Sequence, residues 1–167
     1  MITRYIDILS IILLQMDSID KNIIKLLQHD ASLSAREIAE KVGLTVAPCW
    51  RRIQRLEAEG VITSRVAIID PQKINLSVLA LVEVRTNRHN AEWLEGFINA
   101  IKKFPEIIEA NRTSGEVDYM LRVVAPNMEA YDHFYKRLVE EVDLYDVRTH
   151  FVMERIKATT ELPLQYC

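Results

Sequence analysis

Cysteine and glycine are scarce in this sequence of 167 residues, which contains two cysteines and four glycines. Cys49 and Cys167 lie far apart, with no CxxC or cysteine–histidine spacing, so the sequence predicts neither a disulfide framework nor a zinc site. A reducing cytoplasm is the expected compartment. Phosphate-binding glycine loops, nucleophile elbows and close histidine–carboxylate clusters are also missing. We therefore expect no enzyme, no cofactor and no metal ion.

Long apolar runs are missing as well. Residues 8–14 are apolar except for Ser10, but a membrane-spanning helix needs about 20 such residues, so we expect no membrane anchor. The residues that follow lack the small side chains of a signal-peptide cleavage site. For residues 1–16, which form an N-terminal extension, two interpretations stay open. Either Met16 is the native start, or the extension is an amphipathic segment that packs on a partner subunit.

The chain has little net charge, with a formal value of −3 and a pI near 5.8. That balance argues against the basic coat of a nonspecific nucleic-acid binder. Residues 1–70 carry nine basic and nine acidic side chains, whereas residues 71–167 carry twelve basic and fifteen acidic ones. Because the excess acidity lies in the second half, we expect the two halves to have different partners.

Helix signals come in quick succession in the first half. Apolar residues recur at helical spacing from Ile19, behind acidic residues that favour a helix N-terminus. Ser34 and Glu37 form the capping box of a second helix, which is expected to stop at Gly43, the residue best suited to a left-handed C-terminal cap. Thr45 can cap a third helix almost at once. So short a turn between two helices is typical of a helix-turn-helix.

The third helix, expected to run to about Glu59, has two chemically different sides. Steps of 100° per residue place four apolar residues on one side: Val46, Cys49, Ile53 and Leu56. The other side is expected to face solvent and carries Ala47, Pro48, Arg51, Arg52 and Arg55. Trp50 lies at the edge between them, where packing is favoured over DNA contact. Cys49 follows the apolar spacing and is expected to be a buried small residue rather than a nucleophile.

Arginines on an exposed helix often form only a solvated surface. On the second helix of a helix-turn-helix they face the major groove, where a bidentate arginine–guanine contact is worth about 1–3 kcal/mol of discrimination. We therefore predict contact with double-stranded DNA. Ser34 and Arg36 are expected to contact phosphates. A role as a helix cap for Ser34 and as ordinary surface charge for Arg36 is an almost equally good interpretation. The predicted DNA-binding residues are Ser34, Arg36, Thr45, Ala47, Pro48, Arg51, Arg52 and Arg55.

Residues 61–69 are rich in β-branched side chains and are followed by Asp70 and Pro71, which predicts a short β-hairpin or wing and then a linker. The first domain is thus expected at residues 17–70. Residues 71–167 show the order βαββαβ, with strands at 79–85, 107–112, 117–124 and 147–154 and helices at 91–104 and 128–142. This is an α+β, ferredoxin-like arrangement with both helices on one face of an antiparallel sheet.

The opposite face of this sheet has no helix to cover it. Its strands nevertheless offer apolar side chains on that side, such as Met120 and Val124. In so small a domain a second copy of the same sheet is the simplest cover. We therefore predict a homodimer joined through residues 71–167.

Several separated motifs resemble the Lrp/AsnC (feast/famine) family of transcriptional regulators. In the first half they are IDKNI (19–23), EIAEKVGL (37–44), PCWRRIQRLE (48–57) and GVI (60–62). In the second half they are SGEVDY (114–119), MEAY (128–131) and THFVME (149–154). The resemblance covers residues 17–164. It implies a winged helix-turn-helix joined by a β-strand linker to a ferredoxin-like ligand domain. It also implies dimers that assemble into tetramers or octamers, amino-acid effectors bound near dimer–dimer contacts, and no catalysis.

The stretch 114–118 joins two predicted strands and is at least a hairpin turn with a glycine. An amino acid needs acceptors for its ammonium group, which Asp118 can supply, and donors for its carboxylate, which turn amides near Gly115 can supply. By resemblance, Gly115, Glu116 and Asp118 are candidates for effector binding, together with Met128, His150, Phe151 and Val152. The last four could equally serve packing between dimers. His150 departs from the tyrosine that is common at its position in the family.

Two other functions compete with this interpretation. Ferredoxin-like domains also occur in enzymes and enzyme-regulatory subunits, but the sequence offers no catalytic constellation for that role. An architectural protein that compacts DNA without a ligand would differ only in lacking a response to an effector.

Overall fold

The computed structural model describes residues 16–167, so the expectations for residues 1–15 lie outside it. The chain forms two compact units. The first comprises the chain up to Ile68 together with the C-terminal segment Ala158–Cys167, and the second comprises Ile69–Lys157. Sequence reasoning placed the boundary near Asp70, close to the observed one, but assigned the C-terminal segment to the second domain.

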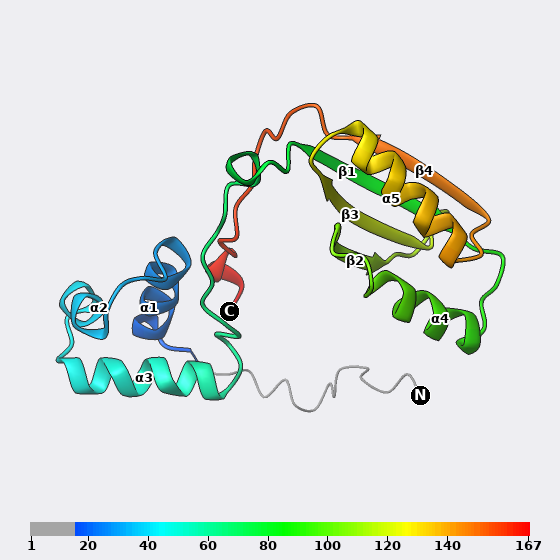
Figure 1. Ribbon diagram of the computed structural model, residues 1–167. Coiled ribbons are helices and arrows are strands. Elements are labelled where there is room, and N and C mark those ends of the chain that lie inside the picture. Colours follow the sequence, from blue (N-terminus) through cyan, green and yellow to red (C-terminus); the bar gives the residue numbers. More distant parts are fainter. Residues whose placement is uncertain (1–15) are drawn as a thin grey trace. The chain divides into compact units, whose positions relative to one another are not determined.

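Three helices build the first unit: α1 (Ser18–His29), α2 (Ala35–Val42) and α3 (Val46–Ala58) (Figure 1). The predicted capping box is present, because the Ser34 hydroxyl accepts from the Glu37 N–H and the Glu37 carboxylate accepts from the Ser34 N–H. Gly43 ends α2 with a φ of 72°, as predicted. The short turn to α3 confirms the helix-turn-helix. Its core includes Ile23, Ile38, Cys49, Ile53 and Leu56, all buried.

The predicted hairpin over residues 61–69 is wrong. After two bent residues this segment runs on to Asp70 without helix or strand, and Val66, Ile68 and Ile69 are exposed. A hairpin needs a turn in its middle, and no glycine, asparagine, aspartate or proline lies between Val61 and Ile69. The segment therefore connects the units as a single extended stretch, which ends where Asp70 caps the short 3₁₀ helix η1 (Pro71–Ile74).

The C-terminal segment Ala158–Cys167, here called the tail, packs on α1. The side-chain amide of Gln28 brackets the backbone of Leu162: its oxygen accepts from the Leu162 N–H at 2.6 Å, and its nitrogen donates to the Leu162 carbonyl at 3.3 Å. Leu164 begins a second 3₁₀ helix, η2 (Leu164–Tyr166), and packs against the helix-turn-helix core. The tail thus completes a domain whose other residues precede it by about one hundred positions.

The second unit is a four-stranded antiparallel sheet with two helices. Its strands are β1 (Val78–Arg85), β2 (Ile107–Arg112), β3 (Tyr119–Ala125) and β4 (Asp146–Phe151), in the spatial order β2-β3-β1-β4. The helices are α4 (Ala91–Ile101) and α5 (Met128–Glu141). Asn90 and Asn127 cap these helices as their sequence positions indicated. Order and pairing confirm the ferredoxin-like βαββαβ fold.

One core lies between the sheet and the helices. Alternate residues of β1 and β3 point into it, among them Val82, Val84, Leu121 and Val123, and meet Phe97 of α4 and Phe134 of α5. The other sheet face carries Leu79, Leu81, Met120 and Val124, mixed with charged residues. None of the described helices packs on that face. It is the surface that sequence reasoning assigned to a second subunit.

Candidate DNA interface and effector site

The N-terminus of α3 is open to solvent. Thr45 occupies the N-cap position with extended backbone geometry, but its side chain makes no capping hydrogen bond. Ala47, two residues further on, is exposed and Pro48 is half-buried. Pro48 has no N–H to lose, so the helix begins undisturbed. The start of α3 therefore presents a hydroxyl, small side chains and the positive end of the helix dipole.

A ridge of exposed residues continues along α3 from this end. Ala47 precedes Trp50 and Arg51 by about one helical turn, Gln54 follows them by about one turn, and all four are exposed. Trp50 is 53% exposed, so the expectation that it packs is wrong. Val46, assigned to the apolar side, is 47% exposed because it lies in the first turn, beyond the edge of the core. Gln54 was missed, although it follows Arg51 by three residues, and glutamine can read adenine.

Arg51 differs from the other two arginines of α3. Among the residues that the structure describes, no carboxylate forms an ion pair with Arg51. Arg52 and Arg55, by contrast, turn toward α1. The Arg52 guanidinium donates to Asp17 at 2.7 Å and to Asp20 at 2.9 Å, and that of Arg55 donates to Asp20 at 2.5 Å.

Arg55 is exposed, as helical spacing predicts, and Arg52 is half-buried, but both form ion pairs that the sequence did not indicate. Arg52 follows the buried Cys49 by three residues, which puts it on the flank of the core, and Arg55 precedes the buried Leu56. Asp20 receives both guanidinium groups and is only 1% exposed. Arg55 also lies 3.8 Å from Glu59. These ion pairs join the recognition helix to α1.

The pKa values around this network follow from its hydrogen bonds. The Asp20 N–H and then the Arg52 guanidinium hold the pKa of the Asp17 carboxyl below its usual value. Bonds to Asp20 and Asp17 raise the pKa of Arg52 above its usual value. Both groups are therefore charged at neutral pH. Burial raises the pKa of the Cys49 thiol, which agrees with its prediction as a buried, unreactive side chain.

The remaining candidates for phosphate contact are partly engaged within the protein. The Ser34 hydroxyl donates to the Glu37 carboxylate at 2.7 Å as part of the cap. Arg36 pairs with Glu40 at 3.3 Å, an exposed pair one helical turn apart that contributes little stability and can open to a phosphate. Both residues lie at the N-terminal end of α2, whereas the turn that leads into α3 follows its C-terminal end.

The loop between β2 and β3 holds three predicted effector residues. Gly115 has a φ of 117°, a conformation that favours glycine, and Glu116 is exposed. The Asp118 carboxylate accepts from the Thr86 N–H at 2.8 Å, and its other oxygen lies 3.9 Å from His89 Nδ1. Asp118 thus ties the start of β3 to the end of β1 and keeps one oxygen largely available to a further donor.

The other four candidates lie at the opposite end of the sheet. Met128 begins α5, just after β3 ends, and Phe151 at the end of β4 pairs with Ala80 near the start of β1. Val152 donates its N–H to the Leu79 carbonyl. About 20 Å of strand separates this end from Gly115, at about 3.3 Å per residue. Figure 1 shows the two ends of β3, with α5 starting at one of them.

Neighbouring residues of β4 also face opposite ways. His150 points to the uncovered sheet face, where its Nε2 lies 3.3 Å from a Glu83 carboxylate oxygen. Phe151 points to the helix side and meets the Tyr131 ring edge-on, with ring centroids 4.9 Å apart. The seven candidates therefore do not surround one space within a protomer.

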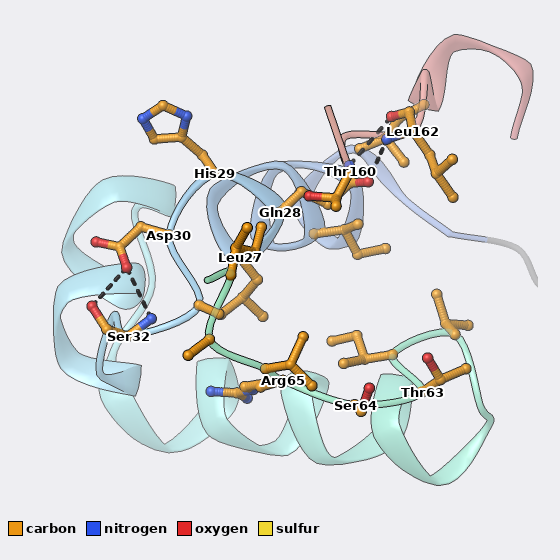
Figure 2. A pocket seen from close by; sticks show the side chains of 18 of the residues that line it. Leu27, Gln28, His29, Asp30, Ser32, Thr63, Ser64, Arg65, Thr160 and Leu162 are labelled. Atoms are coloured by element: carbon orange, nitrogen blue, oxygen red, sulfur yellow. Dashed lines mark hydrogen bonds between the residues drawn. The ribbon is translucent and has the colours of Figure 1, made fainter. Parts of the chain in front are cut away.

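A pocket of about 670 Å³ lies in the first unit, between the end of α1, residues 61–68 and the tail. Figure 2 shows Gln28 beside Leu162 on one side of it and Thr63, Ser64 and Arg65 on the other. None of the predicted effector residues lines this pocket. Arg65 is held to α3 by an ion pair with Glu57 at 2.7 Å.

The described residues form neither a metal-binding cluster nor a membrane-spanning helix. Residues 16–167 contain no group of three or more histidine, cysteine, aspartate or glutamate side chains arranged to hold a metal ion. No helix within the same range has the length and apolar character needed to cross a membrane.

Comparison with known proteins gives two family matches. Residues 16–63 match the model of a winged helix-turn-helix DNA-binding domain, and residues 79–162 match the model of the Lrp/AsnC ligand-binding domain. The chain is similar to the DNA-binding transcriptional activator DecR of Escherichia coli K12. The two are 44% identical over 151 residues, which cover 90% of this chain and 99% of DecR.

Solved structures agree over the same length. An AsnC family transcriptional regulator from Agrobacterium tumefaciens has a TM-score of 0.87 at 50% identity, with 90% of this chain and 99% of that chain covered. A transcriptional regulator from Neisseria meningitidis, solved as a complex with L-methionine, has a TM-score of 0.87 at 32% identity, with 90% and 98% covered.

Proposed function

The chain belongs to the Lrp/AsnC family of DNA-binding transcriptional regulators, which are not enzymes, and from this premise we propose how it reads DNA and senses a ligand. The start of α3 enters the major groove with Thr45, Ala47 and Pro48, and Arg51 reads base edges. Ser34 and Arg36 approach the phosphates beside it. Arg52 and Arg55 position the same helix through their ion pairs with Asp20. The observation that carries this proposal is the exposed ridge of α3, on which Arg51 stands without an ion pair among the described residues.

The second unit is proposed to assemble the protein. Leu79, Leu81, Met120 and Val124 give the uncovered sheet face an apolar centre, while several of its charged residues are paired, as in Glu109–Arg122 and Asp146–Arg148. Charges that enter an interface already paired cost less to bury than unpaired ones. A homodimer joined through this face is the building block, and tetramers or octamers form from it.

The effector is proposed to be an amino acid bound where copies meet. Because the candidate residues lie at two ends of the sheet, about 20 Å apart, one ligand can touch both groups only if they come from different protomers. Asp118 keeps one oxygen for an ammonium group, and the loop around Gly115 offers amide donors. The methionine complex of the related Neisseria meningitidis regulator supports this ligand class. A DNA-binding protein works where the chromosome lies, so the cytoplasm stays the proposed compartment.

Fluorescence anisotropy with a labelled duplex from upstream of the protein's own gene tests the DNA-reading part. Arg51→Ala is expected to weaken specific binding by about 5- to 150-fold at constant salt, the equivalent of about 1–3 kcal/mol. Lys136→Ala removes the same charge from α5, where Lys136 pairs with Asp132, and is the control. Wild-type protein that does not distinguish this duplex from a shuffled one, or Arg51→Ala protein that binds like wild type, would contradict the proposal.

A further inference from the structure

The ion-pair network between α1 and α3 leaves the recognition helix almost uncharged. Both oxygens of Asp20 are used: Oδ1 accepts from Arg52, and Oδ2 accepts from Arg55 and, at 3.3 Å, from the Asp17 N–H. Asp17 adds a second carboxylate on Arg52. Two carboxylates of α1 and its cap thus face two of the three guanidinium groups of α3.

This neutralisation matters because phosphate attraction carries no sequence information. Each phosphate that a cation neutralises adds about 0.9 to the slope of log K against log salt, and it adds equally on every sequence. An arginine that stood free on the flank of α3 would strengthen binding to all DNA. An arginine held by a buried carboxylate cannot leave it without stranding that charge, which is costly in a protein interior.

The two partners of Asp20 also fix the helix in space. Arg52 and Arg55 lie three residues apart, so their bonds to one carboxylate hold the inner face of α3 against α1 over about one turn. The outer face, with Ala47 and Arg51, is oriented as a consequence. One side chain thereby sets both the charge and the orientation of the reading surface.

We propose that Asp20, assisted by Asp17, is a specificity-determining positioning residue of the DNA interface, which withholds Arg52 and Arg55 from phosphates so that α3 meets DNA with Arg51 as its free arginine. The inference rests on the proposed function. It assigns the acidic residues of α1 to the discrimination between DNA sequences, although they do not touch DNA.

Asp20→Asn in the full-length protein is the main test. Asparagine keeps the shape and one acceptor oxygen but removes the charge that holds the arginines. The released guanidinium groups are expected to reach phosphates, so the salt slope becomes steeper by about 0.9 for each new contact. Binding to a shuffled duplex should strengthen about tenfold or more, while binding to the upstream duplex changes less, so discrimination falls. A purely structural role would weaken binding to both duplexes and would leave the slope equal or shallower.

Two further variants and one control sharpen the test. Asp17→Asn keeps the N-cap, since asparagine caps as well as aspartate, and is expected to show a smaller steepening through Arg52 alone. Arg52→Gln should leave the salt slope as in wild type, whereas Arg51→Gln should lower the preference for the upstream duplex over the shuffled one. Asp30→Asn changes the net charge equally at the other end of α1, where Asp30 bonds to Ser32, and should not alter the slope.

The outcomes separate the inference from the proposed function. If wild-type protein does not prefer the upstream duplex, both the proposed function and the inference are overturned. If wild-type protein prefers it but folded Asp20→Asn protein has an equal or shallower slope, only the inference is overturned. If Asp20→Asn protein does not fold, Arg52→Gln decides: an unchanged slope supports the proposal, and a slope flattened by about 0.9 overturns it.

Discussion

The docking of the tail on α1 predicts that a substitution near the C-terminus destabilises the N-terminal domain. Leu164 is partly buried against the helix-turn-helix core. Truncating a fully buried leucine to alanine costs about 2–5 kcal/mol, so we expect about 1–2 kcal/mol for Leu164→Ala. In a domain of this size, 1 kcal/mol lowers the Tm by about 4–8 °C. The DNA-binding unit should therefore melt about 5–15 °C lower, while the second unit is unaffected.

The two tryptophans make this measurement possible, because Trp50 lies in the first unit and Trp93 in the second. In a Trp93→Phe background, fluorescence reports the unfolding of the helix-turn-helix alone. Leu162→Ala is the matched control, because the Leu162 side chain is 72% exposed and only its backbone bonds to Gln28. A change within about 0.5 kcal/mol is expected for it. Equal Trp50 transitions in wild-type and Leu164→Ala protein would refute the assignment of the tail to the first unit.

Two predictions concern the second unit. Asp118→Ala protein should still bind DNA but lose most of its response to an amino acid, a response that typically changes the affinity for DNA about 5- to 150-fold. Anisotropy with each of the twenty amino acids in turn measures this response. If the variant responds at wild-type concentrations, the ligand binds elsewhere. Leu81→Asp puts a charge on the uncovered sheet face, where Leu81 is 37% exposed, and should reduce the oligomer to a monomer in light scattering. The control variant Glu129→Asp on α5 should keep the wild-type mass. An unchanged mass of Leu81→Asp protein would mean that copies join through another surface.

Local signals in the sequence predicted the elements closely. The capping box at Ser34 and Glu37, the glycine cap at Gly43 and the asparagine caps of α4 and α5 all occur as expected. Each of these signals lies within a few residues of the helix end that it determines, which is why spacing alone reveals it. The ferredoxin-like order followed from the alternation of such elements.

The errors concern contacts between residues distant in sequence. Helical spacing places Arg52 on the solvent side, although it follows the buried Cys49 by three residues and is half-buried. Its partner Asp20 lies 32 positions earlier, and the spacing of residues in α3 does not predict a contact with that carboxylate. The tail was likewise assigned to the second domain because its partner Gln28 lies 134 positions away in the sequence. Neither pairing has a local signature.

The split of the effector candidates could have been deduced from the predicted order of elements. In a βαββαβ sheet, the loop before β3 and the helix after it necessarily lie at opposite ends of that strand. Resemblance to the family supplied the residues as one set, without their positions in the fold. Combining the set with the topology indicates that a single protomer does not contain a complete site.

The nearly neutral recognition helix also indicates that the protein works as an assembly of several copies. Arg52 and Arg55 are neutralised internally, and the first 70 residues carry equal numbers of basic and acidic side chains, so one helix-turn-helix has little attraction for DNA in general. Two linked sites can exceed the affinity of either one by about 10²–10⁴. Binding then depends on how many recognition helices the assembled second units present, and at what spacing. If an amino acid binds between protomers, as we propose, it acts on that same assembly and so controls DNA binding without contact with the DNA.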